Sequence, residues 1–229
     1  MLIFKTSTQT DKDMEELINM DKQLLLMING SDSSFVDNLI LILTNAKTWI
    51  PLYIGLAYVV CRVNRDLRSI LLIIGGAALC VLLAGGVDDM IVKPLVARWR
   101  PTHDPEIGSM VDVVDGYRGG NYGFFSAHAA NTFSIAIYIS LLMRQRLLTL
   151  FMVAWSLTNC YTRLYLGVHY PGDICVGLIW GGLVGYSVYR FYYCRLAVPA
   201  SYPLRLCYIP MAILLLTILA AVTAALFLT

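Results

Sequence analysis

The sequence predicts an all-α membrane protein: a polytopic bundle of about six transmembrane helices, preceded by an amphipathic helix at the membrane interface. Three observations lead to this prediction. Hydrophobic residues make up 58% of the 229 residues and charged residues only 14%, a balance that a soluble domain does not need. Apolar stretches of about 20 residues recur, each long enough to cross a bilayer. Glycine and alanine are frequent inside them, so neighbouring helices can approach closely.

The chain divides into two predicted regions. Residues 1–34 are mixed and acidic, and within residues 14–28 apolar and charged side chains follow a helical spacing. We therefore expect an amphipathic interfacial segment there, ended by Gly30 and Ser31. Residues 35–229 are expected to form one transmembrane domain. The chain does not open on a basic region followed by an apolar run, so no signal peptide is expected.

Six segments are predicted to span the membrane. The first, residues 35–63, is interrupted by Lys47 and Pro51. It is either one kinked helix or an interfacial piece followed by a short span. The other five cover residues 67–92, 126–143, 147–166, 171–193 and 204–228. The connection over residues 93–125 is too polar and too rich in glycine to cross the bilayer.

The orientation follows from the arginines. The turns after the first, third and fifth spans carry eight arginines against a single acidic residue, Asp66. The positive-inside rule places this face in the cytoplasm. Residues 93–125 and the turn at residues 163–173 are then expected together on the opposite face, and both termini outside.

Composition also limits the partners. The six cysteines are scattered without a Cys-x-x-Cys pair, so we interpret them as small apolar helix residues. The basic residues are thinly spread, and no nucleic-acid partner is expected. We see no convincing carboxylate cluster, so no metal and no cofactor are predicted.

The turn between the fourth and fifth spans carries Arg163, His169 and Asp173. Ionisable groups beside apolar helices are costly, and they indicate a functional site. Gly167 suits the residue just past a helix end, and Pro171 suits the first turn of the next helix. Asp173 is then near the third helical position, where its carboxylate can reach back to accept a hydrogen bond from His169. The alternative is a capped turn, with Arg163 extended toward the lipid headgroups.

A second basic segment follows the second span. Lys93 and Arg100 are seven residues apart, two helical turns, so both cations can face one way. Pro101 ends that helix. The alternative is a basic girdle that contacts lipid headgroups. Asp89 lies one turn before Lys93 and is expected to pair with it.

A third segment opens the third span. Ser126 is a natural N-cap, and the free amides that follow it, together with the helix dipole, can bind an anion. His128 lies in that first turn, where a lone histidine is more often a cap or a packed polar group. His103, in the intervening loop, is given no role. The three segments fall on one side of the predicted topology, and this coincidence favours a functional site.

These segments resemble the motifs of the type 2 phosphatidic acid phosphatases (PAP2), the membrane branch of the superfamily shared with vanadium haloperoxidases. The family motifs are Lys-x6-Arg-Pro, Pro-Ser-Gly-His and Ser-Arg-x5-His-x3-Asp. Both internal spacings are kept here, in Lys93 to Pro101, Ser126-Ala127-His128, and Thr162 to Asp173. Phe125, Ala127 and Thr162 depart from the pattern, and none of these changes removes an ionisable group.

The resemblance implies a role for each residue. His169 attacks phosphorus and forms a phosphohistidine, Asp173 fixes its tautomer, and His128 protonates the leaving oxygen and later helps to activate water. The implied phosphate-binding residues are Lys93, Arg100, Ser126, Ala127 and Arg163.

The predicted function is that of an integral-membrane lipid phosphatase, metal-independent, in a bacterial inner membrane with its active site on the periplasmic side. Its partners are the bilayer and a lipid phosphate or diphosphate: undecaprenyl diphosphate, lipid A, phosphatidylglycerol phosphate or phosphatidate. The oligomeric state is not predicted. A lipid transporter or flippase is one alternative, although the polar cluster lies at one face and no inverted repeat is visible. A non-catalytic lipid-binding protein is the other, and the intact His169–Asp173 pair argues against it.

Overall fold

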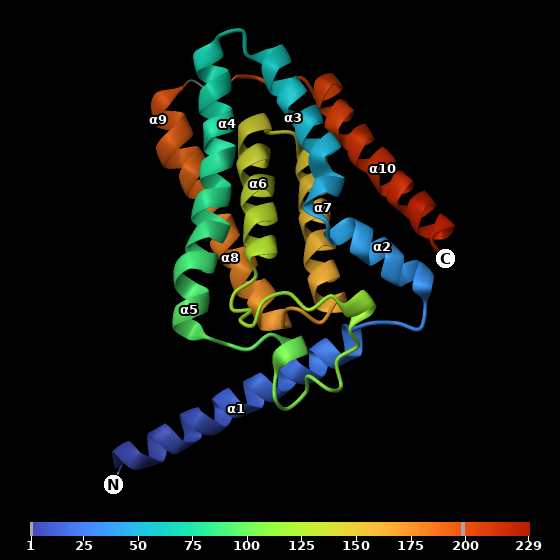
Figure 1. Ribbon diagram of the computed structural model, residues 1–229. Helices are drawn as coiled ribbons and strands as arrows, with labels where there is room; N and C mark the ends of the chain where they lie inside the picture. Colours follow the sequence, from blue (N-terminus) through green and yellow to red (C-terminus); the bar gives the residue numbers. More distant parts are fainter. Residues whose placement is uncertain (1, 198–199) are drawn as a thin grey trace.

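The computed structural model describes residues 2–197 and 200–229, as helices joined by short turns and one long loop (Figure 1). The helices are α1 (Leu2–Ile28), α2 (Ser34–Thr44), α3 (Ile50–Val63), α4 (Leu67–Val81), α5 (Lys93–Val96), α6 (Ala127–Met143), α7 (Arg146–Tyr165), α8 (Pro171–Ser187), α9 (Cys194–Leu196) and α10 (Leu204–Phe227). Short 3₁₀ turns are η1 (Ala46–Trp49), η4 (Pro101–His103) and η5 (Val114–Gly116), and π-helical turns are η2 (Leu82–Gly86), η3 (Asp88–Val92) and η6 (Val188–Tyr193). The prediction of an all-α protein is confirmed.

Three continuous helical stretches are long and apolar enough to cross a membrane: Leu67–Val96, Pro171–Leu196 and Leu204–Phe227. A fourth candidate is the pair Ser34–Thr44 and Ala46–Val63, which bends by 68°. That bend favours the second alternative for residues 35–63, an interfacial piece followed by a short span. Length and composition thus support three or four spans, and the count of six stays a prediction, because α6 is short and α7 is more polar.

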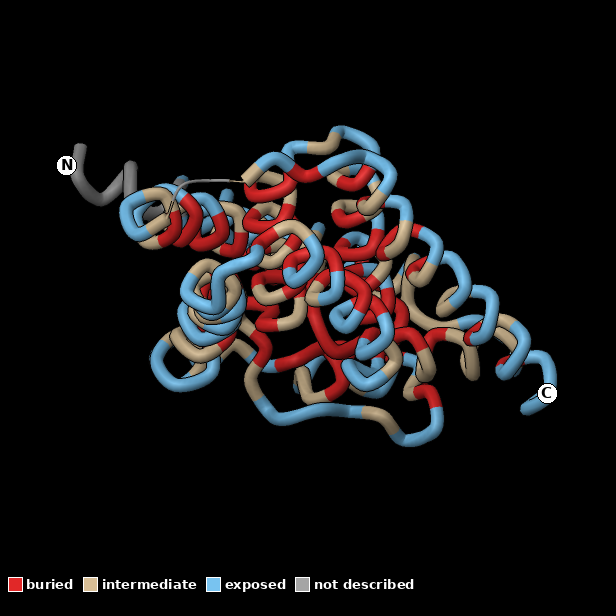
Figure 2. The backbone as a smooth tube through the Cα atoms, turned by 90° about the horizontal axis from the view of Figure 1, so that it is seen from above, coloured by how far each residue is buried: buried red, intermediate tan, exposed pale blue. Residues whose placement is uncertain are grey.

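Helix α6 lies at the centre of the bundle, between α4, α7 and α8 (Figure 1). Seen from above, the buried parts of the chain gather in the middle of the molecule (Figure 2). Glycines of α8 allow the closest approach. A Cβ atom on Gly181 would collide with the carbonyl oxygen of Ala130, and one on Gly185 would collide with that of Ser134. Since only glycine leaves room for a backbone this close, these two positions bring α8 against the first half of α6.

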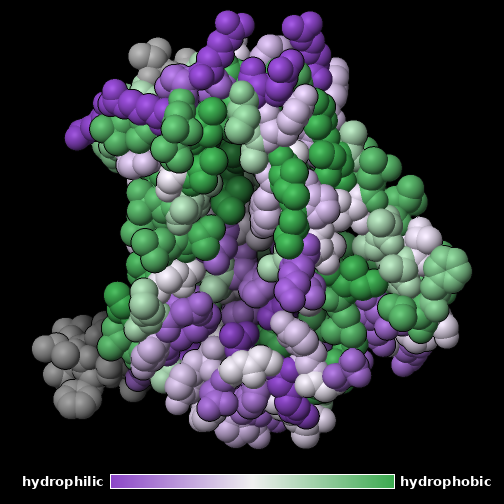
Figure 3. Space-filling view, turned by 45° about the horizontal axis from the view of Figure 1, so that its top comes forward, coloured by the Kyte–Doolittle hydropathy of each residue, from purple (hydrophilic) through white to green (hydrophobic). Residues whose placement is uncertain are grey.

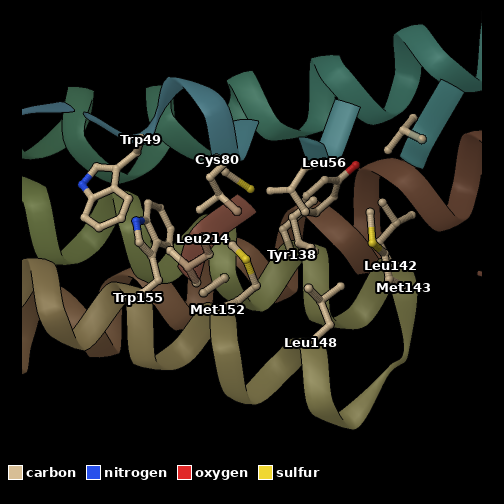
Figure 4. Close-up of a cluster of buried hydrophobic side chains, with 14 of the residues drawn as sticks. Trp49, Leu56, Cys80, Tyr138, Leu142, Met143, Leu148, Met152, Trp155 and Leu214 are labelled. Atoms are coloured by element: carbon tan, nitrogen blue, oxygen red, sulfur yellow. The ribbon is translucent and has the colours of Figure 1, made fainter. Parts of the chain in front are cut away.

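Aromatic side chains anchor the bent first segment to the core. The rings of Trp49 and Trp155 meet edge to face with centroids 6.0 Å apart, and Trp49 Nε1 donates to the carbonyl oxygen of Leu43 at 3.0 Å. Met152 and Leu214 pack in the same cluster (Figure 4). The corner between α2 and α3 is therefore held by buried packing, and this fixes where α2 lies beside α7.

The two ends of the bundle differ. Hydrophilic side chains gather at the top and bottom of the face seen in Figure 3, and hydrophobic ones cover the flanks between them. The arginine-bearing turns α3–α4 and α6–α7 lie at one end; the long loop before α6 and the α7–α8 turn lie at the other (Figure 1). Helix α1 crosses this second end. It begins at Leu2, well before the predicted residue 14, and it buries Leu25 against the loop while Met27 is exposed.

Candidate active site

The α7–α8 turn has the predicted local geometry. Helix α7 ends at Tyr165, and Gly167 adopts a left-handed φ of +63°. Helix α8 begins at Pro171, which puts Asp173 at its third position, where the Asp173 Oδ2 atom accepts from the amide of Tyr170 at 3.0 Å. These local predictions are confirmed. The turn is anchored at both ends, and it holds His169 in a fixed place between the two helices.

The expected hydrogen bond between His169 and Asp173 is not formed. His169 Nδ1 lies 3.6 Å from Asp173 Oδ2, and both side chains are buried. The carboxylate is already occupied, because Oδ2 accepts from Tyr170 and Oδ1 accepts from Arg98 Nη1 at 2.7 Å. The ring and the carboxylate lie side by side as predicted, but the hydrogen bonds of the carboxylate are made with Tyr170 and Arg98 instead.

The other ring nitrogen of His169 faces Arg100. Arg100 Nη1 lies 2.9 Å from His169 Nε2 and also donates to the carbonyl oxygen of Val168 at 2.9 Å. A guanidinium has no acceptor, so Nε2 must offer its lone pair. In the neutral ring the hydrogen is therefore on Nδ1, the atom that faces Asp173. The contacts select the tautomer in which Nε2 carries the lone pair and Nδ1 the hydrogen.

Arg100 reaches this position by a route that the sequence analysis did not predict. The helix ends at Val96, and Ala97 turns the chain with a φ of +50°. Arg100 and the loop then pair as a short antiparallel bridge, with Arg100 N donating to Asn121 O and Gly123 N donating to Arg98 O, both at 2.9 Å. The prediction that Lys93 and Arg100 share one helix face is wrong, because the helix stops between them.

Arg163 is buried rather than extended to the headgroups, with 3% of its surface exposed. Its Nη1 atom donates to Thr44 Oγ1 at 2.6 Å and to the hydroxyl of Tyr117 at 3.0 Å. These two partners come from α2 and from the long loop. The alternative of a snorkelling Arg163 is excluded, and its guanidinium is held inside the site.

The start of α6 has the predicted cap. Ser126 Oγ accepts from the amide of Ala129 at 3.4 Å, and the carbonyl oxygen of Ser126 accepts from Ala130 at 3.0 Å. The amides of Ala127 and His128 therefore have no intrahelical acceptor. The amide of Ser126 donates to the carbonyl oxygen of Asp173 at 3.1 Å, and this bond joins the second motif to the third.

Lys93 forms ion pairs with two carboxylates. Its Nζ atom pairs with Asp89, as predicted, and lies 3.0 Å from Asp88 Oδ2. Asp88 is fully buried, and its Oδ1 atom accepts from the amide of Phe125 at 3.1 Å. The helix that carries Lys93 is thus tied to the residue just before the α6 cap.

All the predicted cations converge on His169. Its pKa is lowered well below the ordinary value of 6.5. Burial is the largest cause, because an imidazolium loses its hydration in the interior. The cations Arg100, Arg163 and Lys93 lower it further, in that order of effect, and His128 follows them. His169 is consequently neutral at physiological pH.

Arg98 is the site residue that the sequence analysis missed. Besides Asp173, it contacts Asp21 of α1, with Nη2 2.7 Å from Asp21 Oδ2. The available signal was Pro101, which makes the residues before it extended. In an extended segment Arg98 and Arg100 point to the same side, whereas the assumed helix separates them. Within the described ranges 2–197 and 200–229, no cluster of His, Cys, Asp and Glu could hold a metal ion.

His169 is buried and neutral, and several cations surround it at one end of an apolar helix bundle. This combination is that of a membrane protein with an anion-binding site. The model of the PAP2 superfamily matches residues 67–197, more than half of the chain, and that range contains all three motifs. The chain belongs to the PAP2 superfamily.

Curated relatives agree with this assignment. The Lipid A 4'-phosphatase of Bacteroides thetaiotaomicron is 42% identical over 178 residues, which cover 77% of this chain and 78% of the relative. The Lipid A 4'-phosphatase of Porphyromonas gingivalis is 33% identical over 181 residues, 78% of this chain and 75% of the relative. A decaprenylphosphoryl-5-phosphoribose phosphatase of Mycobacterium tuberculosis is 34% identical over 96 residues, 42% of this chain and 49% of the relative. No solved structure matches. The chain is a membrane lipid phosphatase.

Proposed function

We propose that this protein hydrolyses the 4'-phosphate monoester of lipid A at the periplasmic face of a bacterial inner membrane. Two Lipid A 4'-phosphatases resemble it over about three quarters of its length, and this similarity favours lipid A over the other three lipids. The orientation is supported by the arginine-bearing turns, which lie at the end of the bundle opposite His169.

The observation that carries the mechanism is the pair of contacts on the His169 ring. Nε2 faces the Arg100 guanidinium at 2.9 Å, and Nδ1 faces the Asp173 carboxylate at 3.6 Å. An imidazole so oriented presents its lone pair toward the cations that attract a phosphate group. The ring acquires positive charge as it attacks, and the carboxylate behind it stabilises that charge.

The phosphate oxygens have several donors to meet. Arg100 Nε and Arg163 Nε are buried without a hydrogen-bond partner among the described residues. The amides of Ala127 and His128 at the α6 N-terminus add further donors. We infer that the arriving phosphate draws the Arg100 guanidinium from His169 Nε2 onto its oxygens. Binding of substrate would then release the nucleophile at the moment it is needed.

The proposed reaction has two displacements. His169 Nε2 attacks phosphorus and the bond to the sugar oxygen breaks, while His128 gives its proton to that oxygen. Water then attacks the phosphohistidine, His128 takes a proton from the water, and the phosphorus–nitrogen bond breaks to release inorganic phosphate. The proton on His128 is restored at the end of the cycle, so the sequence balances.

We expect an acid limb in the pH dependence of kcat/KM, which reports the free enzyme, and an alkaline limb in that of kcat, which reports the enzyme with lipid bound. The rate falls as pH drops through the pKa of His169, because only the neutral ring attacks. That pKa is lowered well below 6.5 by burial and by the surrounding cations, so the acid limb should lie below the ordinary histidine range. The alkaline limb of kcat reports loss of the proton from His128, which the negative charge of the bound phosphate keeps on the ring. A flat profile across pH 4–9 (an approximate working range, about two units either side of histidine's usual pKa) would contradict these assignments.

The substrate is tested by a phosphate-release panel with the purified protein in detergent. Lipid A, phosphatidate, phosphatidylglycerol phosphate and undecaprenyl diphosphate are compared at equal concentration. We expect the largest kcat/KM for lipid A, and 4'-phosphate loss confirmed by mass spectrometry of the product. A clear preference for any of the other three lipids would overturn the substrate assignment while leaving the lipid phosphatase intact.

A further inference from the structure

Helix α1 is connected to the centre of the site through a single arginine. Arg98 Nη1 contacts Asp173 Oδ1 at 2.7 Å, and its Nη2 contacts Asp21 Oδ2 at 2.7 Å. The guanidinium also lies over the ring of Tyr170, 4.2 Å from its centroid. One planar group therefore joins a carboxylate of the N-terminal helix to the carboxylate beside His169, with an aromatic face below it.

Asp21 has a second contact that fixes this arrangement. Its Oδ1 atom accepts from the amide of Gly172 at 2.8 Å, and a Cβ atom on Gly172 would lie 2.9 Å from Asp21 Oδ2. Gly172 directly precedes Asp173. The side chain of Asp21 thus touches the backbone of the first turn of α8 and the arginine that holds Asp173, and the glycine makes this approach possible.

A second set of charges fastens the same part of α1. Lys22 Nζ pairs with Glu106 at 2.6 Å and with Asp104 at 3.6 Å, and Asp104 accepts from the Tyr170 hydroxyl at 2.7 Å. Both sets of contacts end on Tyr170 or its neighbours. Helix α1 is consequently attached to the very turn that carries the reacting ring.

We propose that Arg98 is a positioning residue for the reaction, and that it works only when Asp21 of the docked α1 helix holds its other end. This inference rests on the proposed roles of His169 and Asp173. The fork of Arg98 fixes the Asp173 carboxylate behind the ring, and Asp21 keeps the fork from turning away. The N-terminal helix is then part of the catalytic apparatus, although no atom of it touches the phosphate.

The charges in contact explain why Arg98 matters for the ring as well as for the carboxylate. Burial acts to lower the pKa of Arg98, but Asp173 and Asp21 outweigh it and raise that pKa, so Arg98 stays charged. The positive charge of Arg98 partly cancels the negative charge of Asp173, so Asp173 stabilises a protonated His169 less than it would alone. The groups that face His169 from the packed elements are Lys93, Arg100, His128, Arg163 and Asp173.

The test compares kcat, KM and the acid limb of the pH profile in four variants on lipid A, with His169→Ala measured beside them. For Arg98→Met we expect kcat to fall roughly 10- to 100-fold, because the carboxylate loses its fixed position. The lost cation also raises the pKa of His169 and moves the acid limb to higher pH. For Asp21→Asn we expect a smaller fall in kcat and a shift of the acid limb to lower pH, because a negative charge beside Arg98 is removed. Both variants should leave KM nearly unchanged.

Two further variants serve as comparisons. Arg98→Lys keeps the charge without the fork, so it should keep the wild-type acid limb while kcat stays low. Asp13→Asn removes a carboxylate of α1 that contacts Gln9 on the same helix, and all three parameters should stay at the wild-type values. The opposite shifts of Arg98→Met and Asp21→Asn are not expected from mere loosening of the fold.

Three outcomes would overturn the proposal, and they differ in what else they refute. If His169→Ala is inactive but Arg98→Met and Asp21→Asn behave like Asp13→Asn, the inference is wrong and the proposed function stands. The inference is equally wrong if Asp21→Asn raises KM alone, since α1 also lines a cavity of about 580 Å³ beside Arg98 that can hold part of a lipid. If His169→Ala keeps the wild-type rate, the proposed function is wrong and the inference is refuted with it.

Discussion

Replacing His169 by alanine should lower kcat for lipid A by roughly four to six orders of magnitude, the loss seen when a nucleophile is removed from a cooperating set. The ring is the only proposed group that bonds to phosphorus, and its Nε2 atom already faces Arg100 at 2.9 Å. Phosphate release from the purified variant measures the loss. Rapid quenching of the wild-type enzyme with labelled lipid should trap an acid-labile, alkali-stable phosphoenzyme, which His169→Ala should not form.

His103→Ala is the matched control for this experiment. His103 lies in η4 of the long loop before α6 and contacts the hydroxyl of Thr102 at 3.1 Å, and we assign it no chemical role. Its rate should stay within a few-fold of wild type. A His169→Ala protein that still forms the phosphoenzyme would falsify the nucleophile assignment.

Replacing Asp173 by asparagine should lower kcat by roughly 10³- to 10⁴-fold, as when the orienting acid of a catalytic triad is made neutral. Asp173 meets only donors: the amide of Tyr170, Arg98 and the Nδ1–H group of His169. The side-chain oxygen of asparagine can accept from one of these donors, but its NH₂ group then faces a second donor and forms no hydrogen bond with it. The ring loses both its orientation and the charge that stabilises its cation, so the acid limb should also move to lower pH.

Asp173 also accepts a hydrogen bond at the start of α8, so the fold must be checked separately. Asp66 also stabilises a helix start: it is the N-cap of α4 and accepts from the amide of Ser69 at 2.8 Å, in a turn at the other end of the bundle. Asp66→Ala removes this cap, so it should lower the melting temperature in detergent while keeping the wild-type rate. Equal losses of activity in the two variants would mean that Asp173 acts on stability alone.

Much of the fold follows from local sequence, because local rules decide where helices begin and end. The bounds of α6, α7 and α10 lie within a residue or two of the predicted ones. The left-handed Gly167 and the cap at Ser126 were also predicted correctly. Each of these features depends on the side chain or the backbone freedom of the residue itself.

The predictions from sequence fail where the conformation of a residue depends on a partner that is distant in the chain. The helix after Lys93 stops at Val96 because the chain must pair Arg98 and Arg100 with the loop at residues 121–123. Helix α1 extends back to Leu2, and Asp21 finds its partners in Arg98 and Gly172. No spacing within one segment reports such contacts.

The sequence by itself determined most of the apolar helices and their ends, because periodicity and capping are properties of neighbouring residues, and its motifs supplied the residues that we propose to react. Only the tertiary structure decided what each charge touches. Arg100 contacts Nε2 of His169, and Asp173 accepts a hydrogen bond from Arg98 rather than from the ring. Arg163 is buried between α2 and the long loop. The physical reason is that a buried charge takes whichever partner the packing brings within hydrogen-bond distance, and that packing joins segments far apart in the chain.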